Sequence, residues 1–236
     1  MTRQPRTIAL VGIDGSGKTT QAHRLADDLA AEGLRAAYRR NAGGRRWFGR
    51  LAAALGRGDD AEDLLGRRGM LFIESVLRWL AILRTLLRRA FTGEITVMDR
   101  YAACQYASLR ARAAGPSAER RARLAYRLFP RPDVTFLLAV DPLIAHDRIE
   151  RRGYDHERVE YLSAAAAAYR SLPEYADFVL IDANGTPAEV AAEIRARLPL
   201  PAPVTPARSR VRAMILAGGP LIAGATALGY QLAETL

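Results

Sequence analysis

The sequence predicts an α/β fold, in which a doubly wound parallel sheet of five strands is flanked by helices and followed by an apolar C-terminal tail. Three observations carry this prediction. Short apolar runs alternate with longer segments of helical spacing over residues 1–198. One run, residues 134–140, is apolar almost throughout, as in strands covered on both faces. A glycine-rich loop at residues 12–17 joins the first run to the first helical segment, as in P-loop proteins.

The first half of this domain begins with a strand over residues 7–11 and a helix over residues 21–30, whose apolar side chains share one stripe. Gly33 ends this helix, and a second strand is expected at residues 34–39. Residues 47–66 are rich in Ala, Gly and Arg and are weakly patterned. They predict short helices or a mobile excursion.

A long helix is expected over residues 67–91, and Gly93 ends it. Its apolar stripe consists of Phe72, Val76, Leu80, Leu83 and Leu87. A buried strand over residues 95–99 follows, and it ends in a carboxylate.

The second half of the domain alternates in the same way. Asp141-Pro142 and Thr186-Pro187 are expected to begin helices. The expected strands are residues 134–140 and 178–182, and the expected helices are residues 102–129 with a break at Gly115-Pro116, 142–152, 159–172 and 187–198. Residues 151–158 are strongly charged and contain a glycine, so they are a candidate mobile lid.

The bulk composition limits the classes of partner that the chain is expected to bind. A formal charge of +10 over 236 residues favours anionic partners. Because the arginines are spread along the chain and aromatic residues make up only 7%, we do not expect a nucleic-acid-binding surface. The single cysteine, Cys104, excludes an intramolecular disulfide and suits a reducing cytosol. Residues 1–6 are polar and do not resemble a signal peptide, so we expect a cytoplasmic protein.

The C-terminal region divides into a linker rich in Pro and Arg, residues 199–212, and an apolar tail, residues 213–236. Residues 213–233 carry no charge and are long enough to cross a bilayer, which suggests membrane contact. The glycines and the proline in this segment lower its insertion propensity. The alternative is a helical hairpin that packs on the domain or on a partner subunit.

The most specific motif is Gly12–Thr19, which matches the P-loop pattern G-x-x-x-x-G-K-[ST] at every fixed position. Its backbone N–H groups would surround phosphate oxygens at a helix N-terminus. Lys18 would reach the β- and γ-phosphates of a nucleotide, and the Thr19 hydroxyl would hold Mg²⁺. Of the 35 basic residues, Lys18 is the only lysine. A glycine turn that fits the pattern by chance is the alternative.

A second motif ends the strand over residues 95–99. Asp99 stands where a Walker-B carboxylate would hold Mg²⁺, directly or through water. The alternative is a plain N-cap for the next helix.

These residues resemble the thymidylate kinases, a family of nucleoside monophosphate kinases, from about residue 5 to residue 198. Residues 12–21 are similar to that family's P-loop, including Asp14, and residues 97–101 resemble its Asp-Arg-Tyr motif, whose Arg binds the acceptor phosphate. Arg40 with Gly43-Gly44 is similar to the family's Arg-Glu-Pro-Gly-Gly loop. Residues 134–142, Arg148 and Arg151-Arg152 are similar to its fourth strand and lid.

The resemblance implies ATP- and Mg²⁺-dependent phosphoryl transfer and a set of site residues. The implied ATP-binding residues are Gly12, Asp14, Gly15, Ser16, Gly17, Lys18, Thr19, Thr20 and Arg148. The implied acceptor-binding residues are Asp14, Arg40, Phe72, Asp99, Arg100 and Tyr101, with Phe72 stacked on the base. The implied metal-binding residues are Thr19 and Asp99, and the implied catalytic residues are Lys18, Arg100, Arg151 and Arg152.

The chain departs from the family pattern mainly on the acceptor side. Asn41 and Ala42 replace the Glu and Pro of the family loop, and Val76 replaces a base-reading Arg. The group after Asp-Arg-Tyr differs over residues 102–109. Ser16 replaces an arginine that some members carry in the P-loop, so a lid arginine would have to supply positive charge to the transition state. The alternative is that the lid arginines only form a solvated helix face.

Three hypotheses for function remain. The first is a kinase that makes dTDP from dTMP. The second is a kinase of the same fold with another small acceptor. The third is a nucleotide-binding regulatory or membrane-assembly module with little turnover. Nucleotides are the expected partners, and a homodimer is a further hypothesis.

Overall fold

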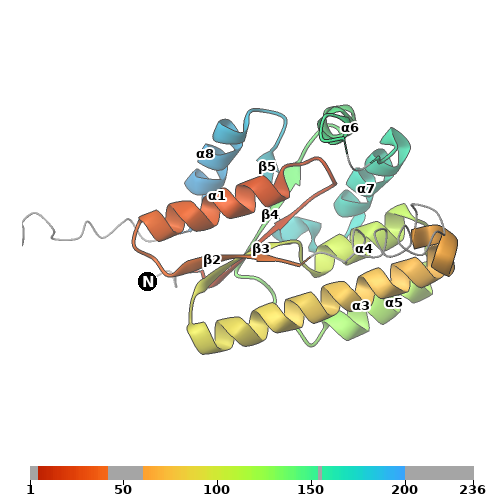
Figure 1. Ribbon diagram of the computed structural model, residues 1–236, viewed down its shortest axis with the longest axis horizontal. Helices are drawn as coiled ribbons and strands as arrows, with labels where there is room; N and C mark the ends of the chain where they lie inside the picture. The colour runs from red at the N-terminus through yellow and green to blue at the C-terminus, as the bar shows by residue number, and fades with distance from the viewer. Residues whose placement is uncertain (1–4, 42–60, 154–155, 200–236) are drawn as a thin grey trace, which may run out of the picture. The chain divides into compact units, whose positions relative to one another are not determined.

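The computed structural model describes residues 5–41, 61–153 and 156–199 (Figure 1). Its centre is a parallel sheet of five strands in the order β2-β3-β1-β4-β5. The strands are β1 (Thr7–Val11), β2 (Ala36–Arg40), β3 (Ile95–Asp99), β4 (Val134–Ala139) and β5 (Val179–Asp182). This arrangement confirms the predicted α/β fold.

Helices cover both faces of the sheet (Figure 1). On one side lie α1 (Lys18–Ala31) and α8 (Pro187–Arg197), which contact each other. The other side carries α3 (Ala61–Thr92), α4 (Ala102–Ala111) and α5 (Pro116–Tyr126). The helices α6 (Pro142–Glu150) and α7 (Val159–Ser171) lie on either side of the lid segment in the chain and contact each other. Helix α7 also packs against α4, and it leads into the short 3₁₀ helix η1 (Pro173–Asp177).

The two central strands bring distant residues together at one edge of the sheet. Strands β1 and β3 are buried along their whole length. Their parallel register pairs Leu10 with Asp99, and the register of β2 with β3 pairs Arg40 with the same Asp99. Because the carboxyl ends of parallel strands meet at one edge, the loop after β1 lies beside Asp99 and beside the end of β2.

Two helix starts follow the expected local chemistry. The Asp141 side chain accepts a hydrogen bond from the backbone N–H of Leu143 at 2.8 Å, which caps α6. Thr186 and Glu189 form a capping box at the start of α8. In both helices a proline follows the cap, where its missing N–H costs no intrahelical hydrogen bond.

The apolar stripe of α3 does not face the core. Phe72, Val76, Leu80 and Leu87 are exposed, and Phe72 keeps 69% of its surface accessible. The buried face of the helix instead carries Leu71, Glu74, Arg78, Ile82 and Thr85. An amphipathic stripe predicts which residues share a face, but it predicts an inward direction only where the core is apolar. Here the inward face contributes polar groups to the site described below.

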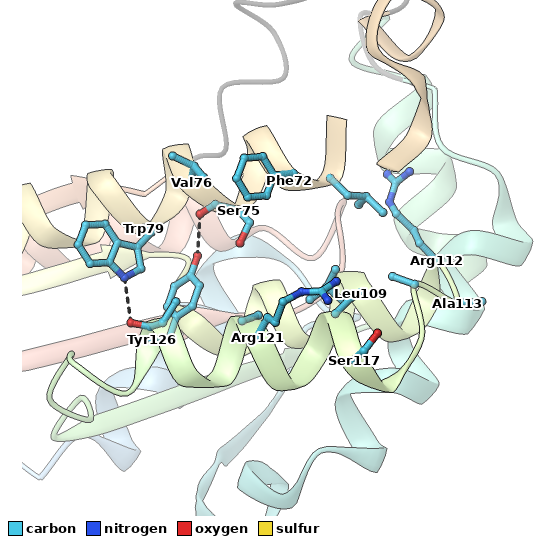
Figure 2. Close-up of a pocket in the computed structure, with 15 residues that line it drawn as sticks. Phe72, Ser75, Val76, Trp79, Leu109, Arg112, Ala113, Ser117, Arg121 and Tyr126 are labelled. Atoms are coloured by element: carbon cyan, nitrogen blue, oxygen red, sulfur yellow. Dashed lines mark hydrogen bonds between the residues drawn. The ribbon is translucent and has the colours of Figure 1, made fainter. Parts of the chain in front are cut away.

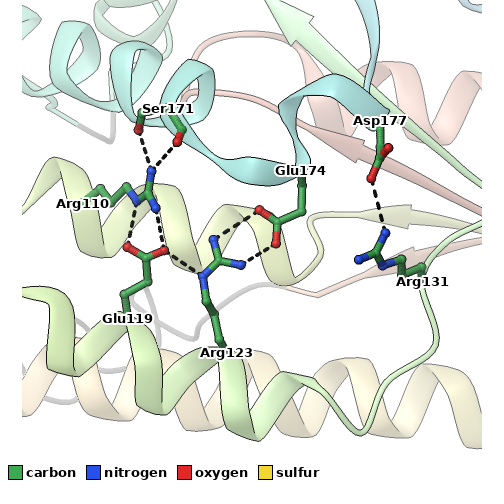
Figure 3. A network of polar contacts seen from close by, with 7 residues as sticks. All are labelled: Arg110, Glu119, Arg123, Arg131, Ser171, Glu174 and Asp177. Atoms are coloured by element: carbon green, nitrogen blue, oxygen red, sulfur yellow. Dashed lines mark hydrogen bonds and ion pairs between the residues drawn. The ribbon is translucent and has the colours of Figure 1, made fainter.

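A network of ion pairs ties α4, α5 and the end of α7 together (Figure 3). Glu119 on α5 accepts hydrogen bonds from Arg110 on α4 at 2.7 and 2.8 Å and from Arg123 at 2.8 Å. Arg110 also donates to the carbonyl oxygen of Ser171, and Arg123 donates to Glu174 in η1. The hydrogen bonds from Arg110 lower the pKa of Glu119 below its ordinary value of 4.5.

We expect Glu119→Gln to lower the free energy of unfolding at neutral pH by about 1 to 2 kcal/mol, because it leaves charged donors without their carboxylate. A carboxyl whose pKa is lower in the folded state stabilises above its unfolded-state pKa and loses that contribution as the pH falls through the folded-state value. The difference between wild type and variant should therefore shrink on acidification below about pH 4. Urea unfolding of both proteins at several pH values measures this difference in the free energy of unfolding.

Asp177→Asn is the matched control, because the Asp177–Arg131 pair in the same region is exposed at both side chains (Figure 3). An exposed pair contributes about 0 to 1 kcal/mol, so this variant should stay close to wild type. Equal losses for the two variants would contradict the role of the network.

Several expectations concern residues outside the described ranges. Within the described ranges, none of the helices has the length and apolar character needed to cross a bilayer. The apolar tail, nearly all of the Pro- and Arg-rich linker, Gly43-Gly44 and part of the candidate lid lie outside those ranges. The predictions about these segments stay predictions.

Candidate active site

The loop after β1 is shaped to receive phosphate. Gly15 has a positive φ of 82°, and a Cβ atom there would overlap the backbone of Ala145. Gly17 has a φ of 86° and caps α1 with no side-chain hydrogen bond. The first N–H groups of α1 therefore point from a bare helix N-terminus, where backbone donors and the helix dipole favour an anion.

Lys18 lies inside this loop. It is only 4% exposed, and its ammonium group donates to the carbonyl oxygen of Ile13 and, at 3.3 Å, to the Ser16 hydroxyl. A carboxylate oxygen of Asp14 lies 3.8 Å from the same Nζ atom. Burial lowers the pKa of Lys18, and the positive charge of Arg100 acts in the same direction. The loop thus holds one compact cation at the place where nucleotide phosphates would lie.

Asp99, at the end of β3, faces the start of α1. Its Oδ2 atom accepts hydrogen bonds from Thr19 Oγ1 at 2.6 Å and from the Tyr38 hydroxyl at 3.2 Å. Burial and then the Asp99 carboxylate raise the pKa of Tyr38 to about 12, so that hydroxyl remains a donor. Among the described residues, the buried Oδ1 atom of Asp99 has no hydrogen-bond partner. A free carboxylate oxygen beside a threonine hydroxyl fits Mg²⁺, which takes few protein ligands and completes its shell with water and phosphate oxygens.

Arg100 follows Asp99 and adopts a positive φ of 77°, which is uncommon outside glycine. Its guanidinium group donates to Asp14 Oδ1 at 2.5 Å. Burial raises the pKa of Asp14, but the charges of Arg100 and Lys18 lower it by more, and the pKa lies well below its usual range. Asp14 in turn raises the pKa of Arg100, so both groups stay charged at neutral pH.

A polar cavity lies beside this ion pair, and both residues of the pair line it. It is lined by Asp14, Arg100, Glu74, Arg78, Cys104, Arg112, Tyr161 and Tyr169, among others. Arg78 on α3 is only 3% exposed and donates to Gln105 Oε1 on α4 at 2.7 Å and to Glu74 Oε1 at 3.4 Å. Tyr169 on α7 donates to the carbonyl oxygen of Gly12 at 3.2 Å. The cavity is therefore built from α3, α4, α7 and the phosphate loop.

Sequence reasoning missed the Glu74–Arg78–Gln105 cluster. Glu74, Arg78 and Thr85 recur at helical spacing on α3, on a face that the apolar stripe does not use. A second, polar stripe of this kind was the available signal. Gln105 gave no comparable signal, because it meets Arg78 only after α3 and α4 are placed together.

Two predicted acceptor-side residues lie outside the polar cavity, and a third, Arg40, lies beside Asp99. Phe72 lines a separate groove between α3 and α5, together with Val76 and Trp79 (Figure 2). The Tyr101 side chain is buried, and its hydroxyl donates to the carbonyl oxygen of Pro130 at 2.6 Å. Arg40 is exposed at the end of β2, beside Asp99 in the sheet register.

A second cavity adjoins the outer side of the phosphate loop. Its lining includes Gly15, Ser16, Gly17, Thr20, Arg148 and Arg152. Arg148 donates to the carbonyl oxygens of Ala183, Asn184 and Gly185 at 2.8 to 3.0 Å, which fixes the loop after β5. Both predicted lid arginines are exposed. Arg152 lines this cavity, whereas Arg151, which follows α6, pairs with Asp147 of that helix.

The geometry defines the class of protein. A P-loop at the end of a central parallel strand, with a carboxylate and an arginine at the end of the neighbouring strand, is the arrangement of a phosphotransferase that acts between two phosphate-bearing substrates. Cavities lie on both sides of the loop, about 210 Å³ on the outer side and only about 40 Å³ beside Arg100, so the inner cavity must widen to admit a nucleotide.

Comparison with known proteins identifies the family. Residues 10–194 match the family model for thymidylate kinase. The chain is 31% identical over 192 residues to a probable thymidylate kinase of Archaeoglobus fulgidus, covering 80% of this chain and 92% of that one. It is 30% identical over 213 residues to the thymidylate kinase of Halorhodospira halophila, covering 83% and 94%. The protein belongs to the thymidylate kinase family and is a nucleoside monophosphate kinase.

We expect Lys18→Arg to lower kcat/KM by at least about 100-fold, the scale of losing one positioned donor in a phosphoryl-transfer site. The buried space between the Ile13 carbonyl oxygen and the Ser16 hydroxyl fits an ammonium group, and a planar guanidinium would push into the phosphate position. A coupled assay of ADP release measures the loss. The control is Arg24→Lys on the exposed side of α1, and retention of activity in Lys18→Arg would contradict the assignment.

Proposed function

We propose that the protein transfers the γ-phosphoryl group of ATP to dTMP in the presence of Mg²⁺, which yields ADP and dTDP. The observation that carries the proposal is the contact between Arg100 and Asp14. It holds a permanently charged guanidinium beside the phosphate loop, in the lining of the polar cavity. An arginine in this position suits the phosphate of an acceptor that must meet the end of a triphosphate.

On the donor side, the loop N–H groups and Lys18 hold the phosphates of ATP. Thr19 and Asp99 would hold Mg²⁺, and the fit rests on the unpartnered Oδ1 atom of Asp99. When bound, the ion supplies positive charge to the phosphate oxygens. Arg152 lines the donor-side cavity and is the lid arginine better placed to add charge there.

On the acceptor side, Arg100 binds the dTMP phosphate and aims one of its oxygens at the γ-phosphorus. A bond forms between that oxygen and the γ-phosphorus as the bond from the γ-phosphorus to the β–γ bridging oxygen breaks, and ADP leaves. Asp14 holds the Arg100 guanidinium in place before the acceptor arrives. Lys18 and Arg100 offset the negative charge as the two substrates approach each other.

The Glu74–Arg78–Gln105 cluster reaches the polar cavity through Glu74 and Arg78, which can read the base, while Gln105 binds Arg78 and is not part of the lining. Among the described residues, three of its buried atoms have no hydrogen-bond partner: Arg78 Nε, Gln105 Nε2 and Glu74 Oε2. At the cavity, Arg78 Nε is a donor and Glu74 Oε2 is an acceptor. Thymine presents carbonyl oxygens and a ring N–H, which can pair with such a donor and such an acceptor. Arg78 thus supplies a guanidinium that can substitute for the family's base-reading arginine, which Val76 replaces here.

Two observations favour a second candidate, a kinase of the same fold that acts on another small acceptor. The cavity beside Arg100 contains the Glu74 carboxylate, and Phe72 lines the separate groove rather than this cavity. An acceptor with more N–H donors than thymine would suit such a carboxylate. Activity measured against a panel of substrates therefore distinguishes dTMP from another acceptor.

The purified full chain, assayed with ATP and Mg²⁺ against dTMP, dUMP, dCMP, dGMP and dAMP, should show its highest kcat/KM for dTMP and no turnover without Mg²⁺. Arg78→Ala should raise the KM for dTMP by about tenfold or more and leave the KM for ATP unchanged, because a buried donor to the base is lost. Arg84→Ala, on the exposed side of the same helix, is the matched control.

The other outcomes separate the rival functions. Efficient turnover of a different acceptor would replace dTMP and support the second candidate. Tight ATP binding with no turnover across the panel would overturn the kinase proposal in favour of a nucleotide-binding module.

We also propose that the chain forms a homodimer through α3. The exposed side chains of Phe72, Val76, Leu80 and Leu87 form an apolar stripe along this helix, and a groove of about 800 Å³ lies beside it, against α5 (Figure 2). Such a stripe is self-complementary when two copies pack antiparallel about a two-fold axis. Its exposure is otherwise unfavourable in water.

Sedimentation of the wild-type protein should give twice the chain mass of 25.8 kDa, and Leu80→Arg should give a monomer, because it places a charge at the centre of the stripe. Leu143→Arg, at an exposed leucine of α6, is the control that should leave the mass unchanged. A monomeric wild-type protein would contradict the proposal.

A further inference from the structure

The backbone at Arg100 is held in a conformation that needs support. Its positive φ is rare for a residue with a side chain, and such conformations persist only where surrounding contacts fix them. One contact is the hydrogen bond from the Arg100 N–H to the carbonyl oxygen of Leu10 at 3.1 Å. This bond fixes one end of the residue. The Arg100 carbonyl group at the other end needs a partner of its own.

Asn41 supplies that partner. Its side-chain Nδ2 donates to the Arg100 carbonyl oxygen at 3.0 Å. Its own backbone N–H donates to the carbonyl oxygen of Asp99, also at 3.0 Å. Asn41 therefore binds two consecutive carbonyl groups of the turn that carries Arg100. Its exposed fraction is 0%, so it does not touch the substrates itself.

Thr85 on α3 fixes the direction of the Asn41 amide. The Thr85 hydroxyl donates to Asn41 Oδ1 at 3.0 Å and is itself buried. If the amide were flipped, its oxygen would face the Arg100 carbonyl oxygen, and the two acceptors would repel each other. Only the amide orientation with the NH₂ group toward Arg100 satisfies both neighbours.

The residue type matters at this position. The loop of the resembled family has Glu here, and a carboxylate cannot donate to a carbonyl oxygen. We infer that Asn41, supported by Thr85, is a positioning residue that holds Arg100 in the conformation needed to bind the acceptor phosphate. The inference rests on the proposed function, in which Arg100 binds that phosphate.

The decisive variant is Asn41→Asp, which has the same shape and still accepts from Thr85 but cannot donate to the Arg100 carbonyl oxygen. It should weaken dTMP binding in calorimetry by about tenfold, the scale of one lost buried hydrogen bond. The KM for ATP should stay unchanged. Thr85→Val should act in the same direction, and Thr85→Ser, which keeps the hydroxyl, should bind dTMP like the wild type.

A double-mutant cycle separates positioning from a general effect on the fold. In an Arg100→Ala background, Asn41→Asp should cause no further loss of dTMP affinity, because the group that it positions is gone. An equal loss in both backgrounds, or no loss in either, would overturn the inference. If Asn41→Asp fails to fold, Thr85→Val replaces it in the same double-mutant cycle.

A readout without substrates keeps this test apart from the test of function. Backbone amide hydrogen exchange in the peptide that contains Arg100 should be faster in Asn41→Asp than in the wild type, while exchange in β5 stays unchanged. Faster exchange in a protein that phosphorylates no nucleotide would sink the proposed function alone. Unchanged exchange and unchanged dTMP affinity in an active kinase would sink this inference alone.

Discussion

The ion pair between Asp14 and Arg100 is the contact on which the site depends. Asp14 comes from the loop after β1 and Arg100 from the turn after β3, 86 residues further along the chain. They meet because the two strands are buried neighbours in one parallel register. In the proposed function, the pair lies between the donor side of the site, with Lys18, and the acceptor side, with Arg78. A shift of either strand would break the pair and disconnect the two halves.

The donor half and the fold could be predicted from sequence because their signals are local. The phosphate loop is one unbroken motif, and its strand and helix lie on either side of it. Asp99 was identifiable as the last residue of an apolar run, and the parallel topology places such an end beside the loop. Their contact through Thr19 follows from the architecture and needs no further information.

The acceptor half could not be predicted in the same way, because its residues meet only in the folded chain. The direction of α3 illustrates the reason. Its apolar stripe was readable, but the sequence does not say that this stripe faces away from the sheet while Arg78 faces inward. Gln105 lies 27 residues after Arg78, on another helix. Asn41 was visible as a departure from the family pattern, yet its bond to Arg100 depends on β2, β3 and α3 together.

The chain's use of a single lysine has a consequence for its covalent chemistry. Outside the N-terminal amine, Lys18 carries the only primary amine among the side chains, and it is buried within the phosphate loop. Amine-directed reagents and lysine modifications therefore have one side-chain target in this sequence. Any group attached there would occupy the position of the nucleotide phosphates, so modification of the amine and occupancy by nucleotide exclude each other.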